Sequence, residues 1–304
     1  MRYEVSAADR APMPVSYAGE PRYLGYRAAE RSLPYAGFFQ AATRPIQEHV
    51  VHALVGGRAP AEFGYGVDEV ADRLARPGYE RLETGWTRLP GGVVMVAVHT
   101  PMPDVTAAMW DWWFGWHGRE TARYKLWHPD AHQYTGLGED RSADRTLTDR
   151  QRYVGNVSYV DEYVGGRLQR LAIRFVDPEK MGIAPAPATT HICARVTLSA
   201  HPVAIGWLVH QVRPTGEGSE MRSRFFLGDA ATLRLPGRAL PPGPAARLLT
   251  SPAGRAVGGA LVPKAAPRLM PADTGGAMIH HCAAEMNHLA GFLPRLYERF
   301  WDTP

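Results

Sequence analysis

The C-terminal end of the chain constrains the fold most, because it carries a long amphipathic pattern. We predict a helix over residues 273–301, with Asp273 as its N-cap and Pro294 as a position where it can kink. Apolar residues recur at helical spacing and form one stripe: Met278, Cys282, Leu289, Phe292, Leu293 and Leu296. A stripe of this length has to be buried, so the helix is expected to pack against the rest of the domain.

Upstream of this helix, runs rich in β-branched and aromatic residues predict antiparallel strands. The predicted strands cover residues 92–99, 153–163, 168–176, 190–199, 204–213 and 221–227. The sequence Thr215-Gly216-Glu217-Gly218 predicts a hairpin turn between the last two. After the first strand, Asp104 is expected to cap a helix that runs through Trp116. Residues 236–272, rich in Pro, Gly and Ala, are predicted to form a long ordered loop or a partly helical excursion.

The N-terminal part has weaker patterns. Residues 1–45 predict an irregular arm that wraps its own domain or a partner subunit. Short helices are predicted over 46–56 and over 68–75, the second with Asp68 as its N-cap. We therefore divide the chain into an N-terminal region, 1–80, and a larger domain, 81–304. The order of elements in the larger domain predicts an α+β fold, in which a curved antiparallel sheet grips one long helix around an interior cavity.

Composition narrows the class of protein. The 304 residues carry a net charge of only +4, and the basic residues are scattered, which argues against a nucleic-acid partner. Two cysteines, Cys193 and Cys282, are too few for a disulfide framework and favour a reducing compartment. The N-terminus lacks an apolar core and no long apolar run occurs, so we expect no signal peptide and no membrane span. The prediction is a cytoplasmic protein without a nucleic-acid or membrane partner.

His281 and Glu285 lie four residues apart on the predicted terminal helix, and therefore on one face of it. Both fall on the apolar stripe, so their side chains are expected to point inward. A buried carboxylate is costly unless it is paired or bound to a metal. An imidazole and a carboxylate on one helix face can form half of a zinc site. A core histidine hydrogen-bonded to a glutamate explains the same spacing, and the two interpretations both stay open.

Two further groups of donors lie in the middle of the chain. His128 and His132 are four residues apart, but Pro129 between them argues against a regular helix, so one of the two is the better ligand candidate. Asp161 and Glu162 end a strand pattern, where alternation lets only one of them face the cavity. The residues alone do not decide either choice.

Residues 110–117 contain four of the eight tryptophans. Helical spacing puts Trp112 and Trp116 on one side, and Trp110 and Trp113 on another. This pattern is typical of a heavily packed helix, and it also fits the wall of a cavity for a flat, apolar ligand.

Four stretches of the sequence resemble the 2,4-diacetylphloroglucinol hydrolase and phloretin hydrolase family, over roughly residues 85–300. They are Trp-Trp-Phe-Gly-Trp-His at 112–117, Tyr-Lys-Leu-Trp-His-Pro at 124–129 with His132, Glu-Met-Arg-Ser-Arg-Phe at 220–225, and the pair His281 and Glu285. The resemblance implies a Bet v 1/START-like helix-grip catalytic domain. It also implies that the N-terminal region, residues 1–80, makes the contacts of a homodimer.

The same resemblance implies one zinc ion. Its ligands in this sequence are His132, Glu162, His281 and Glu285. Tyr124 matches the family tyrosine that binds the phenolic substrate, whereas Thr135 stands where the family has a substrate-contacting asparagine. As acid or base candidates, His128, His210 and Lys125 rank below Tyr124.

The reaction that the resemblance implies is hydrolysis of the carbon–carbon bond between an acyl group and a phloroglucinol-type phenol ring. It releases a carboxylic acid and the deacylated phenol. Such a site needs a proton donor near the ring, a positioned water and a stabiliser for the acyl oxyanion. The alternative is a START-like carrier or a non-hydrolytic cyclase for aromatic polyketides, because a fold does not decide a function. Inward-facing metal ligands distinguish the two, since a carrier does not need them.

Overall fold

A single antiparallel sheet forms the centre of the molecule. The computed structural model describes residues 16–199, 201, 203–232 and 244–304. The sheet has eight strands in the order β1-β2-β8-β7-β6-β5-β4-β3. The strands are β1 (Gly85–Arg88), β2 (Val94–Pro103), β3 (His132–Leu137), β4 (Val157–Val164), β5 (Arg167–Val176), β6 (Thr190–Leu198), β7 (Val203–Thr215) and β8 (Gly218–Thr232).

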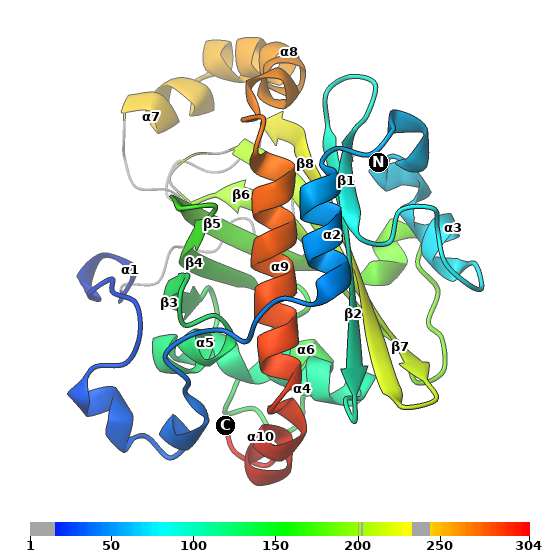
Figure 1. Cartoon of the computed structure of the whole chain (residues 1–304). Helices are drawn as coiled ribbons and strands as arrows, with labels where there is room; N and C mark the ends of the chain where they lie inside the picture. Colours follow the sequence, from blue (N-terminus) through cyan, green and yellow to red (C-terminus); the bar gives the residue numbers. More distant parts are fainter. Residues whose placement is uncertain (1–15, 200, 202, 233–243) are drawn as a thin grey trace.

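One long helix, α9 (Thr274–Ala290), lies across one face of this sheet. In Figure 1, β2 and β7 run nearly along α9, whereas β4 and β5 cross behind it, so the sheet bends around the helix. The apolar stripe of α9 is buried in the main core, as Ile279, Met286 and Leu289 illustrate. The predicted α+β fold, with a sheet that grips the C-terminal helix, is confirmed.

The prediction of one helix over 273–301 is wrong in its length. Helix α9 ends at Ala290, and a separate helix, α10 (Leu293–Phe300), begins with Pro294 in its first turn. Proline has no N–H to continue a helix but is tolerated in a first turn, which explains the break. Asp273 does occupy the N-cap position, but its side chain makes no capping bond. Its carboxylate lies 3.4 Å from Arg167 instead.

The other helices differ from the predictions mainly at their ends. Helix α4 (Ala107–Trp116) is capped by Thr106, which accepts from the backbone N–H of Met109. The predicted cap at Asp104 is wrong, because this residue has φ 63° and belongs to the turn before the helix. Residues 149–153 form helix α6 (Asp149–Tyr153), so the strand predicted from 153 begins later, at Val157.

The excursion before α9 is helical where the structure describes it. It contains α7 (Pro244–Thr250) and α8 (Pro252–Leu269), as the second of the two alternatives predicted, whereas 233–243 lie outside the described residues. The predicted hairpin is confirmed, since β7 ends at Thr215 and β8 begins at Gly218. Among the described residues, no helix is long and apolar enough to cross a bilayer.

The four tryptophans of α4 are buried in the core. The rings of Trp112 and Trp116 stack with centroids 4.9 Å apart, and the ring of Tyr297 from α10 meets Trp112 edge-on. The packed-helix interpretation is therefore confirmed. The cavity-wall interpretation holds for Phe114 and His117 of the stretch 110–117, which line the cavity, and not for the four tryptophans.

The N-terminal region packs on both faces of the sheet. Helix α2 (Glu48–Gly56) lies beside α9 in Figure 1, and its Val50 belongs to the main core. Helix α3 (Val70–Ala75) contributes Val70 and Leu74 to a second core on the opposite face. Glu69, not Asp68, precedes α3, so the predicted cap is wrong. The division at residue 80 stays a prediction.

Short segments complete the described chain. They are α1 (Ser16–Gly19), α5 (Thr121–Trp127) and the 3₁₀ helices η2 (Ala28–Ser32), η3 (Ala36–Phe38), η4 (Ala61–Phe63), η5 (Val67–Glu69), η6 (His117–Arg119) and η7 (Pro178–Met181). The sequence patterns did not predict β1, β3 and α5. Two of these elements carry residues of the site described below, His132 on β3 and Tyr124 on α5.

Candidate metal centre

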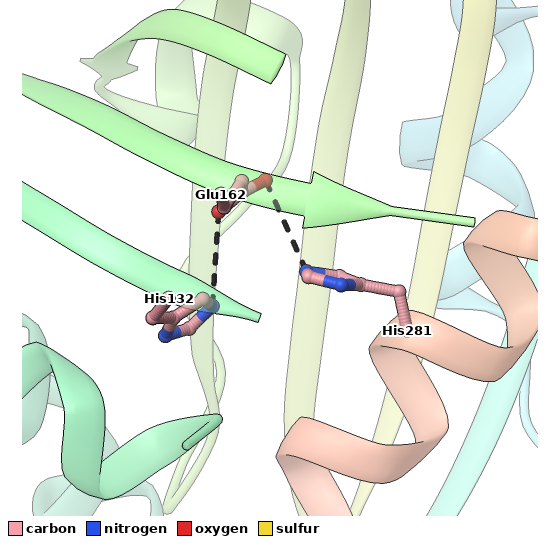
Figure 2. A group of neighbouring side chains, drawn as sticks. All are labelled: His132, Glu162 and His281. Carbon is pink, nitrogen blue, oxygen red and sulfur yellow. Dashed lines mark ion pairs between the residues drawn. The ribbon is translucent and has the colours of Figure 1, made fainter. Parts of the chain in front are cut away.

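A cluster of buried imidazole and carboxylate groups lies between the sheet and α9 (Figure 2). His132 on β3 lies opposite Glu162 on β4 in the strand register, and a bulge follows His132. His281 reaches the same point from α9. One ligand atom from each of these three residues lies within 4.8 Å of the others, and all three residues are buried. This spacing suits ligands that surround one ion.

Glu285 joins the cluster from the next turn of α9. Its Oε2 atom lies 3.5 Å from Nε2 of His132 and 3.8 Å from Nε2 of His281. Glu162 faces the same two nitrogens, at 3.7 Å from His132 and 3.9 Å from His281. The four residues of the expected ligand set thus converge, with nitrogen and oxygen atoms pointing at one another.

The ring of His132 is oriented for metal binding. Its Nδ1 lies 3.0 Å from the backbone carbonyl of Tyr124, which can only accept, so Nδ1 carries the proton. The Nε2 lone pair therefore faces the two carboxylates, and this buried atom has no hydrogen-bond partner among the described residues. Such a backbone contact is what fixes the tautomer of metal-bound histidines. An orphaned acceptor beside two carboxylates fits a bound cation.

Electrostatics leads to the same conclusion. Burial, and the neighbouring His128 and His281, hold the pKa of His132 well below its usual range. Burial, and then the nearby Glu162, raise the pKa of Glu285 well above its usual range. Left to themselves the imidazoles stay neutral and Glu285 favours its protonated form, whereas a divalent cation reverses the second preference. Two imidazoles and two carboxylates form a donor set that zinc accepts.

The structure brings one residue of each pair that the sequence left open into the cluster. Asp161 lies on the other side of β4, where its carboxylate is 3.0 Å from Arg22. His128 is not part of the ligand group; its ring stacks on His281 with centroids 4.9 Å apart. His132 and Glu162 are thus the residues that the fold brings together. Lys125 pairs with Glu30 at 3.2 Å and does not line the cavity.

Tyr124 connects the cluster to the cavity. It lies on α5 with its ring parallel to that of His132, at 3.7 Å between centroids. Its hydroxyl donates to Oε2 of Glu162. Burial and then Glu162 raise the pKa of this tyrosine well above its usual value, so the hydroxyl keeps its proton. The residue is buried and lines the cavity.

A cavity of ≈ 380 Å³ opens beside the cluster. Most of its wall is apolar, and the groups that line it around the cluster are Phe114, Trp127, Val160, Leu171, Ile173, Phe175, Leu208, Phe225 and Met278. Near the cluster, polar atoms come from Glu162, His281 and Glu285 and from Tyr124, His117, Ser158 and His210. Further polar lining comes from Arg167, Gln169, Asp273 and Thr274. A cavity of this size, apolar with a few converging polar groups, suits a small organic ligand.

The sequence patterns did not predict His117 and Ser158 as residues of the site. The signal for Ser158 was present, since Ser158, Val160 and Glu162 alternate along β4 and all line the cavity. His117 follows α4 and its Nδ1 donates to the backbone carbonyl of Trp113 at 2.7 Å, a contact that no sequence spacing predicts. Thr135 is not among the residues that line this cavity.

Comparison with known proteins identifies the family. The sequence profile described as "DAPG hydrolase PhiG domain" matches residues 66–298. A 2,4-diacetylphloroglucinol hydrolase of Pseudomonas protegens is 31% identical over 99% of this chain and 96% of its own length. A phloretin hydrolase of Eubacterium ramulus is 26% identical over 67% of this chain and 76% of its own.

Among solved structures, a point mutant of norcoclaurine synthase from Thalictrum, in complex with a transition-state analogue, shares 12% identity at a TM-score of 0.33. The aligned region covers 68% of this chain and 98% of the norcoclaurine synthase chain. The sequence matches extend over most of the chain, and they confirm the resemblance seen in the motifs. This chain belongs to the DAPG hydrolase PhiG domain family.

Proposed function

We propose that this protein is a zinc-dependent hydrolase that cleaves the carbon–carbon bond between an acyl group and a phloroglucinol-type phenol ring. The observation that carries the proposal is the position of Tyr124: its hydroxyl donates to Glu162 inside the buried ligand cluster, while its side chain lines the apolar cavity. The family supplies the class of reaction, since its members include a 2,4-diacetylphloroglucinol hydrolase and a phloretin hydrolase.

The four ligands proposed for zinc are His132, Glu162, His281 and Glu285. A zinc ion held there supplies a Lewis acid that lowers the pKa of water and polarises a carbonyl oxygen. The protein holds the two imidazoles neutral by burial, so both Nε2 lone pairs are available to the metal. Elemental analysis of the purified chain tests the identity of the ion.

The remaining chemistry falls to the residues of the cavity. Hydrolysis adds the water oxygen to the acyl carbon, breaks the bond from that carbon to the ring, and delivers one proton to the ring carbon. Tyr124 keeps the proton of its hydroxyl and lines the cavity. A phenolic or ketonic oxygen of the ring would lie beside this hydroxyl, which binds and orients it. The apolar wall excludes bulk water from the rest of the substrate.

Two other polar groups line the cavity and stay uncharged at neutral pH. Burial lowers the pKa of His117 to about 4 and that of His210 to about 3. Nδ1 of His210 lies 2.8 Å from the hydroxyl of Ser223, which fixes the ring. A neutral, fixed imidazole can hydrogen-bond a phenolic hydroxyl without attracting anions, which suits a polyhydroxylated ring better than a charged wall would.

A carrier or a non-hydrolytic cyclase is the less favoured alternative. Burying two carboxylates and two imidazoles against α9 costs stability unless a cation compensates them. A protein that only binds an apolar ligand has no use for these buried polar groups, and apolar side chains in their place would make it more stable. The cluster therefore favours catalysis.

Product analysis tests the activity. Zinc-replete protein is incubated with mono- and diacylated phloroglucinols, without nucleotide or redox cofactor, and the products are separated. We expect a free carboxylic acid and the deacylated ring in equal amounts. Substrate that binds but is never cleaved would favour the carrier instead.

We also propose that the protein acts in the cytoplasm as a homodimer, to which residues 1–80 contribute much of the contact. Both cysteines are buried and free, as in reducing compartments. Val51 and Val55, one turn apart on α2, are exposed at 42% and 84% and offer an apolar surface in that region. Light scattering of the full-length chain at micromolar concentration should give the mass of a dimer, and a monomer would contradict the proposal.

A further inference from the structure

The mouth of the cavity has an unusual border. It is lined by Met270 and Pro271, which follow directly after α8, and by Gly165 and Arg167 at the tip of the β4–β5 hairpin. Asp273 joins the two sides, since its carboxylate lies 3.4 Å from Arg167. The lining residues that are exposed to solvent, Gly165, Arg167, Pro271 and Asp273, all lie here, so we place the opening of the cavity between the end of α8 and this hairpin tip.

Helix α8 is almost completely uncovered. Only Gly258 and Pro267 of its eighteen residues are buried. Val257 and Leu261, one turn apart, are each 58% exposed, and Leu269 at the end of the helix is 78% exposed. Across the mouth, Leu168 of the hairpin is also exposed. Aliphatic side chains thus reach solvent along α8, at its C-terminal end, and at the hairpin tip.

All charged residues of α8 are basic. Between Asp229 and Asp273 the sequence contains no acidic residue but six basic ones. Arg255, Lys264 and Arg268 of α8 form no ion pair with any residue that the structure describes, and all three are exposed. Exposed aliphatics interspersed with unpaired cations are typical of surfaces that rest on anionic lipid.

We propose that α8, together with the tip of the β4–β5 hairpin, docks on a negatively charged lipid surface. The mouth between them would then open toward the bilayer, from which an apolar substrate can enter. A second copy of the chain is the less suitable occupant, because a two-fold contact would place the same cations against each other. The sequence predicted no membrane partner because it has no apolar span, but contact with a surface does not require one.

Vesicle co-sedimentation of the full-length protein tests this proposal without substrate, so its result is independent of the proposed hydrolase activity. Vesicles of phosphatidylcholine mixed with phosphatidylglycerol should bind the protein at low salt, and vesicles of phosphatidylcholine alone should not. High salt should release it, because surface charges are screened. No binding to the anionic vesicles at low salt would overturn the proposal.

Two matched pairs of variants locate the surface. Arg255→Gln with Lys264→Gln should weaken binding roughly fivefold for each charge removed. Arg295→Gln with Arg299→Gln removes the same charge from α10, at the opposite end of the molecule in Figure 1, and should leave binding unchanged. Equal losses in the two variants would mean that only net charge matters, and would overturn the assignment to α8.

The aliphatic part has its own comparison. Val257→Ser with Leu261→Ser should weaken vesicle binding, whereas Trp301→Ser, directly after α10, should not. Turnover of a water-soluble substrate should stay at the wild-type level in both α8 variants, because none of these residues lines the cavity. If the α8 aliphatic variant instead breaks an oligomer seen by sedimentation equilibrium, the surface is a contact between copies and the lipid proposal is wrong.

Discussion

The two faces of the sheet each bury a polar cluster, and the clusters are built on opposite principles. On the face toward α9, two imidazoles and two carboxylates converge, and Nε2 of His132 has no hydrogen-bond partner among the described residues. On the other face, Glu83 accepts hydrogen bonds from Arg222, at 2.6 Å and 3.1 Å, and from Arg224. The carboxylates of the cluster facing α9 have no cationic side chain beside them in the part of the chain that the structure describes, whereas the carboxylate of Glu83 is neutralised by Arg222 and Arg224.

Strand β8 separates the two clusters by simple alternation. Ser223 and Phe225 face the cavity side, so Arg222 and Arg224 must face the second core. Each arginine has a further partner there: Gln211 accepts from Arg222 at 3.0 Å, and the hydroxyl of Tyr65 accepts from Arg224 at 2.9 Å. A network that satisfies all of its members rigidifies the fold. A cluster whose buried acceptor has no hydrogen-bond partner is suited to binding a cation from solution.

The largest expected effect follows from removing a ligand. His281→Ala or Glu285→Ala should abolish metal retention and turnover, because each removes one of four converging donors and leaves only three side chains to hold the ion. Metal content by elemental analysis, and rate, are measured on the same preparation. A variant that retains a full equivalent of zinc would show that the cluster is not the metal site.

The next effect is on stability. Although burial raises its pKa, hydrogen bonds and charge from Arg222 and Arg224 bring the pKa of Glu83 down to about 2, from 4.5. Glu83→Gln leaves two buried guanidinium groups without their carboxylate and should cost about 3–5 kcal/mol in the free energy of unfolding. Denaturant titration measures it. Metal content per folded molecule should not change, which separates this cluster from the other.

The same pKa gives the pH dependence of that difference. A carboxyl with a lowered folded pKa contributes stability that is fully present above its unfolded value, near 4.5, and that is lost as the pH falls toward 2. The gap between wild type and Glu83→Gln should therefore be constant around neutral pH and shrink below about 4.5. A gap that persists unchanged at pH 3 would mean that the carboxylate charge is not what the arginines need.

The contrast between the clusters also explains what the sequence could predict. His281 and Glu285 lie four residues apart on one helix, so their spacing predicts that both side chains point to the same side. The choice of Glu162 over Asp161 follows from strand alternation once β3 is in register with β4, and that register depends on a bulge after His132 that no local pattern reveals. The fold class followed from the order of strands and the terminal helix, because both have strong periodicity.

The second cluster was not predictable in this way. Glu83 lies in the loop before β1, and it meets Arg222 across 139 residues of sequence. The motif at 220–225 resembles a family motif, but its charges do not indicate which residue pairs with them. Short elements such as β1 and α5 were missed for the same reason, since their stability comes from contacts made after the sheet assembles rather than from local propensity.

A smaller change tests the cavity side of the comparison. Tyr124→Phe removes only the hydroxyl that donates to Glu162. Removing a hydrogen bond to a charged group costs about 1.5–3 kcal/mol, or roughly ten- to a hundredfold in rate if it acts fully in the transition state. Folding and zinc content should survive. A variant with wild-type kcat and KM on a cleaved substrate would show that Tyr124 only packs against His132.

The smallest effect comes from the same substitution on the other face. Tyr65→Phe removes the hydroxyl that accepts from Arg224, and Arg224 keeps its contacts with Glu83 and with the carbonyl of Ser223. The expected loss is about 1–2 kcal/mol of stability, because one donor of a buried guanidinium is left unsatisfied. Turnover of the folded protein should not fall, since Tyr65 lies in the second core and does not line the cavity. Measuring both rate and unfolding for both tyrosine variants gives a crossed result if the two clusters are separate. If Tyr65→Phe slows catalysis as much as Tyr124→Phe does, β8 couples the two faces, and the stabilising cluster also positions the wall of the cavity.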